Sequence, residues 1–258
     1  MGEYYRQKEL VMYQFFVDDE QVHEDCIYIT GTDVNHIGNV LRMRPGEKIR
    51  ISNRSGVAYF CHIKEIEPEL VLAEIDEIDE SGTELQSRIY LFQGLPKADK
   101  MELIIQKAVE LGVYEIIPVA MKNCVVKLDA KKAASKLSRW QAIAESAAKQ
   151  SKRTIIPGMK EPISWKEACA LAEELDIVLV PYENERGMEA TREVINHIKP
   201  GQSIGIMIGP EGGFAESEIS MVDELGEQFH RISLGRRILR TETAGLATLA
   251  MLVFALDL

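Results

Sequence analysis

The sequence predicts an α/β protein with a small β-rich domain at its N-terminal end. Three observations indicate this class. Short β-rich segments separated by turn signals fill the chain up to about Ile78, which is typical of a small barrel or sandwich. From Arg88 onward, strand-like and helix-like segments alternate, which indicates a mostly parallel sheet with helices on both faces. The polar, glycine-containing joint Asp79–Glu84 lies between the two regions.

The first region, residues 12–80, is expected to hold five strands and one helix. Residues 1–11 are polar and are expected to be a loose extension. The helix spans Thr32–Leu41, with Thr32 or Asp33 as its N-cap. Turn signals such as Pro45-Gly46 separate the strands. The expected strands are Phe15–Val17, Cys26–Ile29, Lys48–Ser52, Val57–Ile66 and Leu70–Ile78.

The second region, residues 85–258, carries the alternating pattern. In Asp99–Leu111 the apolar residues recur on one helical face, and Gly112 ends the helix. Ser164 begins the helix Trp165–Leu175, with Glu167 completing a capping box. A loop is expected around Pro157-Gly158 and Pro162. The other expected helices are Lys131–Lys149, Met188–Ile198 and Ala244–Leu256, and the expected strands are Arg88–Gln93, Tyr114–Val119, Ile177–Pro181, Ile204–Ile208 and Phe229–Leu234.

Composition narrows the class of protein. The formal net charge of −11 means that bulk electrostatics does not favour nucleic-acid binding. The start Met1–Arg6 is polar and predicts no signal peptide, and the apolar run Ala244–Leu256 is too short to span a bilayer. The cysteines form no C-x-x-C pair and the histidines no metal spacing, so we expect no metal site, no membrane and a cytoplasmic protein. The cysteines are Cys26, Cys61, Cys124 and Cys169.

Two strand ends in the last quarter of the chain carry glycine-containing backbone. Gly209–Gly213 follows one expected strand, and Gly235 follows the other, just before the basic run Arg236–Arg240. Ligands of open α/β sheets bind at the carboxyl ends of strands, and glycine lets the backbone approach a ligand closely. A tight turn would explain the first cluster alone, but the second loop favours a pocket. The pattern G-x-G-x-x-G is missing, which disfavours a standard dinucleotide site.

Basic residues gather in two places despite the acidic total. The stretch Lys122–Lys160 is rich in lysine and arginine, and within it only Asp129 and Glu145 oppose them. A solvated helix face would explain one such run equally well, but two sets favour a long polyanion as the partner. The second set lies in the first region and consists of Arg42, Arg44, Lys48, Arg50 and Arg54.

Several motifs together resemble one known family. Ile208–Phe214 reads IGPEGGF, and Ser233–Ala244 reads SLGRRILRTETA. Further matches are Met101–Gly112, Arg139-Trp140, Glu145–Ser151 and His36–Gly46. In this combination the chain resembles the bacterial RsmE family, whose members methylate N3 of one uridine, position 1498, of 16S rRNA and belong to the SPOUT superfamily. The likeness covers roughly residues 12–258.

The resemblance implies a fold and a set of partners. Residues 12–80 would form a PUA-like β-barrel that binds RNA, and residues 85–258 a SPOUT-type α/β domain with a deep trefoil knot. The protein would be a homodimer that binds S-adenosylmethionine in the knot and acts on 16S rRNA within the 30S subunit.

It also implies roles for single residues. Arg240 and Arg236 are expected to stabilise the developing uracil anion or to anchor a phosphate, and the alternative is an ion pair with Glu211 or Glu242. Glu242 either accepts the N3 proton or is a first-turn residue favoured by the helix dipole, and both interpretations stay open. The RNA contacts are expected at Arg42, Arg44, Lys152 and Arg153. The cofactor-binding residues are expected to be Val180, Pro181, Gly209, Pro210, Glu211, Gly212, Gly213, Leu234, Gly235, Ile238, Leu239, Arg240 and Thr243.

Two alternatives remain beside this function. Another SPOUT enzyme would methylate a ribose 2′-oxygen or a different base. A non-catalytic RNA-binding module would keep the fold without binding the methyl donor, although the intact glycine loops argue against it.

Overall fold

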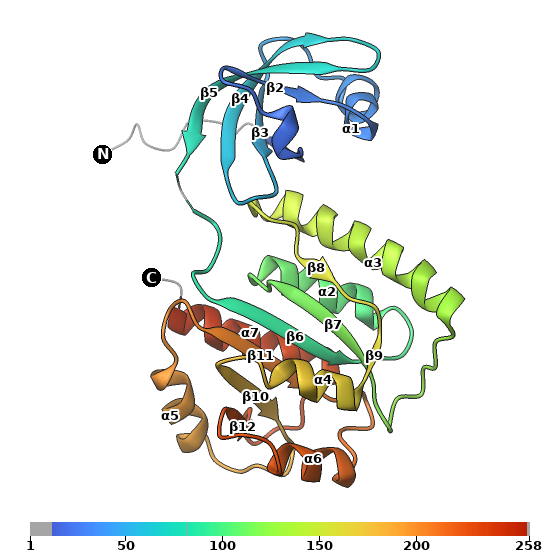
Figure 1. Ribbon diagram of the computed structural model, residues 1–258, viewed down its shortest axis with the longest axis vertical. Helices are drawn as coiled ribbons and strands as arrows, with labels where there is room; N and C mark the ends of the chain where they lie inside the picture. The colour runs from blue at the N-terminus through green and yellow to red at the C-terminus, as the bar shows by residue number, and fades with distance from the viewer. Residues whose placement is uncertain (1–11, 81, 257–258) are drawn as a thin grey trace. The chain divides into compact units, whose positions relative to one another are not determined.

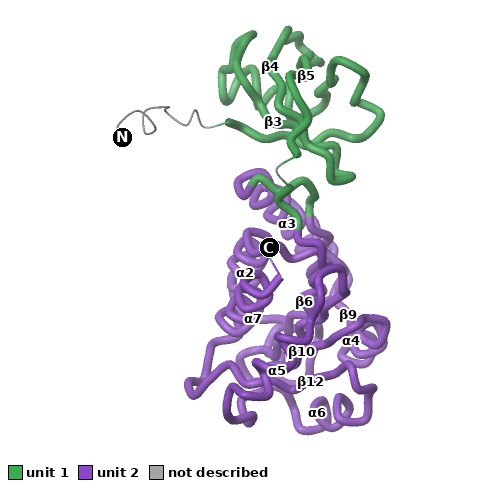
Figure 2. Tube along the Cα trace, turned by 90° about the vertical axis from the view of Figure 1, so that its left-hand side faces the viewer, with its two compact units in different colours: residues 1–84, 152–156 green, residues 85–151, 157–258 purple. Residues whose placement is uncertain are grey.

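The computed structural model describes residues 12–80 and 82–256. The extension expected at residues 1–11 and the polar start of the chain lie outside the described residues. The chain forms two compact units (Figure 2). The first comprises the described residues up to Glu84 together with Lys152–Ile156, and the second comprises Leu85–Ser151 and the described residues from Pro157 onward. The chain therefore passes between the units three times, at 84/85, 151/152 and 156/157.

The first unit is built on a curled five-stranded sheet (Figure 1). The strand order is β1-β3-β4-β5-β2, in which β1 is parallel to β3 and the other neighbours are antiparallel. Its core is formed by apolar side chains such as Phe15, Ile49 and Ile63. The expected β-rich domain is confirmed. The strands are β1 (Tyr13–Phe16), β2 (Cys26–Ile29), β3 (Lys48–Ser52), β4 (Ala58–Ile66) and β5 (Val71–Asp79).

The helix expected between β2 and β3 is present as two short pieces. The α-helix α1 (Thr32–Asn35) continues as a π-helical turn, η2 (His36–Val40). The predicted N-cap was wrong, because Thr32 and Asp33 already lie inside the helix and Gly31 precedes it without a side-chain cap. Gly31 has φ of +72°. This left-handed conformation is one that glycine adopts without a steric cost.

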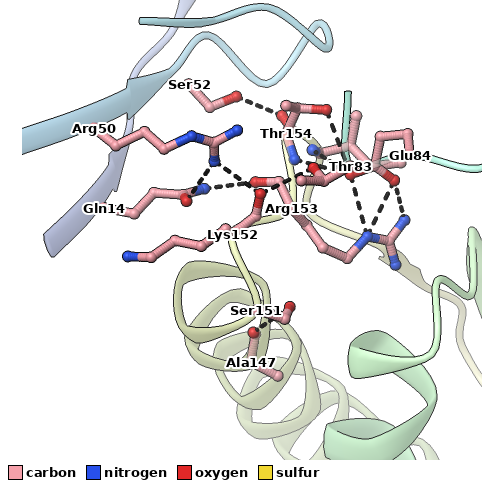
Figure 3. A network of polar contacts seen from close by, with 11 residues as sticks. Gln14, Arg50, Ser52, Thr83, Glu84, Ala147, Ser151, Lys152, Arg153 and Thr154 are labelled. Atoms are coloured by element: carbon pink, nitrogen blue, oxygen red, sulfur yellow. Dashed lines mark hydrogen bonds and ion pairs between the residues drawn. The ribbon is translucent and has the colours of Figure 1, made fainter. Parts of the chain in front are cut away.

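The segment Lys152–Ile156 is fixed in the first unit by buried polar contacts (Figure 3). The Gln14 side chain donates a hydrogen bond to the carbonyl of Arg153. Arg50 donates from Nη1 to Gln14 Oε1 at 2.6 Å and to the carbonyl of the segment's first residue at 2.8 Å. Its Nε also pairs with Asp79 at 2.6 Å. Arg50, one of the basic residues expected to bind a polyanion, is therefore buried inside the unit and does not lie on its surface.

The two basic side chains at the start of this segment are also engaged. Arg153 is 3% exposed and pairs with Glu84, which accepts from its Nε at 3.0 and 3.2 Å. The same carboxylate accepts from the backbone N–H of Thr154 at 2.8 Å. Lys152 is partly buried and donates to the carbonyl of Met12, and burial lowers its pKa. Neither cation is presented to solvent in the way that an RNA contact requires.

Replacement of Glu84 by alanine is expected to destabilise the first unit. The change removes the carboxylate that pairs with the buried Arg153, and breaking a buried pair in this way costs about 3–5 kcal/mol. Because the Glu84 side chain is 23% exposed, we expect a loss near the lower end, about 3 kcal/mol, in the free energy of unfolding measured with urea. Glu77→Ala, an exposed change on β5, is the control. Equal midpoints for the two variants would contradict the prediction.

The second unit contains, among the described residues, a seven-stranded sheet in which every neighbouring pair is parallel. The order is β12-β10-β11-β6-β7-β8, and β9 also pairs with β7. The predicted parallel sheet is confirmed. The expected loop near Pro162 was partly wrong, because β8 and β9 are two-residue strands there, too short to show a pattern. The strands are β6 (Arg88–Gly94), β7 (Glu115–Ala120), β8 (Gly158–Met159), β9 (Ile163–Ser164), β10 (Ile177–Pro181), β11 (Ser203–Ile208) and β12 (Phe229–Ile232).

Helices cover both faces of this sheet (Figures 1 and 2). On one side α7 packs against α2 and β11, and α3 packs against α2. On the other, α4 and α6 share an apolar core with sheet residues such as Val180 and Met207. The stop at Gly112 and the capping box of Ser164 with Glu167 are both confirmed. Helix α6 was not predicted, because its eight residues hold few apolar repeats. The helices are α2 (Lys100–Glu110), α3 (Ala130–Gln150), α4 (Trp165–Ala172), α5 (Glu189–His197), α6 (Glu216–Asp223) and α7 (Thr241–Leu256).

Candidate active site

The glycine loop Gly209–Gly213 folds back on itself after β11. The N–H of Gly213 donates to the carbonyl of Pro210 at 2.9 Å, and Gly213 has φ of +66°. A Cβ added to Gly209 would lie 3.1 Å from the carbonyl carbon of Gly213 and 3.2 Å from the nitrogen of Phe214. At Gly213 an added Cβ would lie 2.8 Å from a carboxylate oxygen of Glu183. The loop therefore needs glycine for two reasons, a left-handed turn and close backbone packing.

A pocket of about 310 Å³ lies against this loop. It is lined by backbone-rich segments from the ends of β10 and β11 and from the entry to α7. A second, smaller pocket of about 90 Å³ shares Pro181, Glu183, Ile238, Leu239 and Ala244 with it and adds the turn after β12. The first pocket is lined by Pro181, Glu183, Ile208, Gly209, Pro210, Glu211, Gly212, Gly213, Phe214, Ile238, Leu239, Arg240, Thr241 and Ala244, and the second also by Tyr182, Glu185, Arg186, Ser233, Leu234, Gly235 and Arg237.

Most of the predicted cofactor-binding residues line these two pockets, and two do not. Val180 is fully buried in β10, where it packs in the core behind the strand end. Thr243 is exposed on the first turn of α7 and lines neither pocket. Sequence reasoning missed Glu183, which lines both. It follows Pro181 by two residues, so the same strand-end rule could have found it.

A buried hydrogen-bonded chain joins three strand and helix ends beside the pocket. Thr241 Oγ1 donates to the carbonyl of Gly209 at 2.6 Å, and Gln93 Nε2 donates to Thr241 Oγ1 at 2.9 Å. Gly209 directly follows β11, Thr241 begins α7, and Gln93 lies near the end of β6. The Thr241 hydroxyl therefore binds backbone rather than lying free in the pocket. The contacts fix the glycine loop relative to the first turn of α7.

Lys100, in the first turn of α2, forms ion pairs that link the glycine loop to the start of α7. Its Nζ lies 3.1 Å from Glu211 and 3.3 Å from Glu242. Glu211 also accepts a hydrogen bond from the backbone N–H of Lys97 at 3.0 Å. Burial acts to raise the pKa of Glu211, but the Lys97 N–H and the Lys100 ammonium outweigh it and lower the pKa. One cation thus holds both carboxylates, so Glu211 and Glu242 are engaged by Lys100.

Replacement of Lys100 by methionine is expected to weaken binding of the ligand of this pocket. Without the ammonium, Glu211 and Glu242 would repel each other and shift the glycine loop, and a misplacement of this kind is costly in a preorganised site. We expect about a tenfold rise in the dissociation constant of S-adenosylmethionine, the ligand that the family resemblance implies, measured by calorimetry. The matched control is Lys107→Met on the same helix, where the lysine pairs only with Glu110 among the described residues. Equal affinities would show that Lys100 does not position the loop.

Arg236 and Arg240, in the loop after β12, do not pair with Glu211 or Glu242. Arg240 lines the larger pocket, and its exposed side chain has no hydrogen bond or ion pair within the described part of the chain. Arg236 is exposed and lines neither pocket. An ion pair of either arginine with Glu211 or Glu242 is therefore not formed. Arg240 is the cation placed to meet a negatively charged group in the pocket.

The basic stretch Lys122–Lys160 carries less unpaired positive charge than its sequence suggests. Acidic residues from other elements neutralise part of it: Arg139 pairs with Glu102 at 2.8 Å, and Lys160 with Glu115 at 3.7 Å. In the first unit, Arg50 is buried with Asp79, Arg54 lies 3.6 Å from Asp18, and Arg42 and Arg44 are exposed.

The sequence predicts neither a metal site nor a membrane-spanning segment. Among the described residues, no cluster of His, Cys, Asp and Glu side chains has the composition of a metal site. Within the same residues, no helix combines the length and the apolar character needed to cross a membrane.

Comparison with known proteins agrees with this geometry. Residues 83–253 match the family described as RNA methyltransferase domain, and residues 29–76 match the RNA methyltransferase PUA domain. The chain is 35% identical to ribosomal RNA small subunit methyltransferase E of Bacillus subtilis, over 96% of this chain and 98% of the relative. A crystal structure of ribosomal RNA small subunit methyltransferase E from Neisseria gonorrhoeae bound to S-adenosylmethionine is 33% identical, with a TM-score of 0.79 and coverage of 94% and 97%. A putative methyltransferase from Legionella pneumophila, also solved with that cofactor, is 31% identical, with a TM-score of 0.79 and coverage of 95% and 98%.

Proposed function

Because the chain belongs to the ribosomal RNA small subunit methyltransferase E family, we propose that it uses S-adenosylmethionine to methylate N3 of one uridine of 16S rRNA. The observation that supports this most directly is the pocket of about 310 Å³ formed by the Gly209–Gly213 loop and the entry to α7. Its volume lies at the lower end of the range of small-molecule sites, about 300–1,000 Å³. A side chain at Gly209 or Gly213 would fill or distort this cradle.

Main-chain groups would hold the donor. The glycine loop offers its peptide N–H and carbonyl groups, and the turn at Leu234-Gly235 together with Ile238 and Leu239 offers a second wall. Such groups can satisfy an adenosine and an amino-acid moiety by hydrogen bonds without adding a charged side chain. When bound, S-adenosylmethionine supplies an electrophilic methyl group on a sulfonium sulfur. Val180 supports this arrangement from the core, and Glu183 adds a carboxylate to the pocket rim.

The reaction places clear demands on the acceptor side. The N3 proton of uracil must leave, so the base has to be out of any base pair, and the nitrogen lone pair then forms the new N–C bond while the S–C bond breaks. Negative charge gathers on the uracil ring as the proton leaves. Arg240, with its unpaired guanidinium at the pocket, is proposed to stabilise that charge, with Arg236 as a neighbouring cation. Glu242 is assigned to positioning through Lys100.

Arg42 and Arg44 are proposed as the RNA contacts of the first unit, which corresponds to the PUA-like domain of residues 12–80. Both side chains are exposed. Lys152 and Arg153 are left out of this set, because their partners within the unit engage them. The methyltransferase domain is proposed to comprise residues 85–258. The deep trefoil knot that the family resemblance implies belongs to the same proposal.

The test is methylation of purified 30S particles from a bacterial strain that lacks the activity. We expect the wild-type protein with S-adenosylmethionine to produce 3-methyluridine, identified by mass spectrometry of the nucleosides. A 2′-O-methylated nucleoside or another methylated base would instead support a different SPOUT specificity. Binding of RNA with no donor binding in calorimetry would support the non-catalytic module.

The protein is further proposed to be a homodimer that uses α7. One face of α7 packs in the core, while the opposite face presents apolar residues at helical spacing, Ala247, Ala250, Met251 and Phe254. Phe254, near the end of this helix, is 92% exposed. Exposed apolar patches of this kind mark interaction sites.

Replacement of Phe254 by glutamate is expected to convert the dimer to a monomer, because a carboxylate would be buried in the apolar face. Light scattering should give about 58 kDa, twice 29.0 kDa, for the wild type and about 29 kDa for the variant. Leu171→Glu, at a half-exposed site on α4, is the control and should leave the mass unchanged. A wild-type protein that is monomeric at micromolar concentration would refute the proposed dimer.

A further inference from the structure

A third pocket, of about 570 Å³, lies at the same edge of the parallel sheet. Its walls come from the ends of β6 and β7, from the loop 122–129 and from the start of α3. The surface is mostly apolar, with Met121, Cys124 and Leu128 among its lining residues. Lys122 and Lys127 also line it, and Glu161 is the acidic residue there. It shares no lining residue with the pocket at the glycine loop, so it is distinct from the proposed donor site.

The third pocket and the glycine loop are nevertheless joined by direct contacts. The Asn123 side chain donates to the carbonyls of Gly212 and Gly213 at 3.1 and 3.2 Å. On the other side of the loop, a Cβ added to Gly94 would lie 2.7 Å from the nitrogen of Pro210 and 2.8 Å from Met121 Sδ. The third pocket therefore lies beside the glycine loop, and a group bound there would lie next to the proposed site of methyl transfer.

Charge also distinguishes this place from the rest of the basic stretch. Further along α3, Arg139 and Lys149 have acidic partners, at 2.8 and 3.0 Å. By contrast, the exposed side chains of Lys122, Lys127 and Lys131 have no ion pair within the described part of the chain. Two of these three lysines, Lys122 and Lys127, line the apolar pocket. A nucleotide has the complementary chemistry, an apolar base face and an anionic phosphate.

We propose that this pocket binds an unstacked nucleotide of the RNA substrate, next to the base that is methylated. Its base would lie between apolar side chains, as in other sites that take a nucleotide out of its stack, and its phosphate would face Lys122 and Lys127. The inference rests on the proposed function, because it assumes that RNA is the substrate. It adds a position at which the enzyme can select the sequence or shape around its target.

A pair of matched variants on α3 tests the proposal. Ala133 lines the pocket, whereas its neighbour Ala134 is exposed on the same helix and does not. Ala133→Phe should fill the pocket and raise the KM for 30S particles by about tenfold, the scale expected for one lost base contact. Ala134→Phe should change this KM by less than about twofold, since it leaves the base contact intact. Neither change should alter the affinity for S-adenosylmethionine, which calorimetry measures.

A second variant keeps the test independent of folding. Lys122→Ala combined with Lys127→Ala should also raise the KM and reduce the salt dependence of 30S binding by about 1 per lysine. If the wild type is active and both the Ala133→Phe and the double-lysine proteins keep its KM, the nucleotide pocket is refuted while the proposed function stands. A changed oligomeric mass of Ala133→Phe would assign the pocket to a second copy of the chain instead. A wild type that leaves 30S particles unmethylated would refute both proposals.

Discussion

Replacement of Gly209 by valine is expected to lower the affinity for S-adenosylmethionine by at least about 100-fold, one of the two largest effects predicted for this protein. An added Cβ would lie 3.1 to 3.3 Å from backbone atoms of Gly213 and Phe214, and valine adds two methyl groups beyond it. Backbone cannot move aside as the end of a side chain can. The loop would have to open, and the main-chain cradle that lines the pocket would be lost.

The matching control for this experiment is Gly245→Ala. At Gly245, in α7, the nearest atom to an added Cβ is Gln93 Oε1 at 3.5 Å, an ordinary contact. Alanine also favours the helix over glycine, by about 1 kcal/mol. Calorimetric titration with S-adenosylmethionine should therefore separate the two variants, while circular dichroism reports whether each is folded. A folded Gly209→Val protein that binds the donor as tightly as Gly245→Ala would show that the cradle lies elsewhere.

The position of the pocket could be predicted from the sequence because it depends on a rule about topology. Parallel strands end at one edge of a sheet, so Gly209–Gly213 and Leu234-Gly235 had to lie near each other once both were placed after strands. In the structure, these segments line two adjoining pockets. Helix ends could be predicted for a similar reason, since Gly112 and Ser164 carry local signals.

Contacts between distant residues could not be predicted in the same way. Nothing in the sequence marks Lys100 as the partner of Glu211 and Glu242, because its role depends on how α2 packs beside α7. Arg153 looked like one more member of a basic surface. Its burial follows from Glu84, a residue of the joint between the two regions, and from the return of the chain into the first unit. A charge pattern alone cannot separate a solvated cation from a paired one.

Replacement of Arg240 by alanine is expected to lower kcat for 30S methylation by about 10² to 10³, with the affinity for S-adenosylmethionine nearly unchanged. A guanidinium gains little from a bound sulfonium, which is itself a cation, and the amino-acid moiety of the donor is assigned to main-chain groups, so we do not expect Arg240 to strengthen donor binding. Its favourable partner is the uracil anion that exists only as N3 loses its proton. Interactions made only with such a species change kcat rather than binding.

Two companion variants make this assignment specific. Arg240→Lys keeps the charge but not the planar fork, so it should recover part of the lost rate. Arg192→Ala removes an exposed arginine of α5 that lines neither pocket at the glycine loop, and it should leave kcat unchanged. Single-turnover methylation of 30S particles by all three proteins separates chemistry from product release. If Arg240→Ala matches Arg192→Ala in that assay, the developing anion is stabilised by another group, and Arg240 has no part in the chemical step.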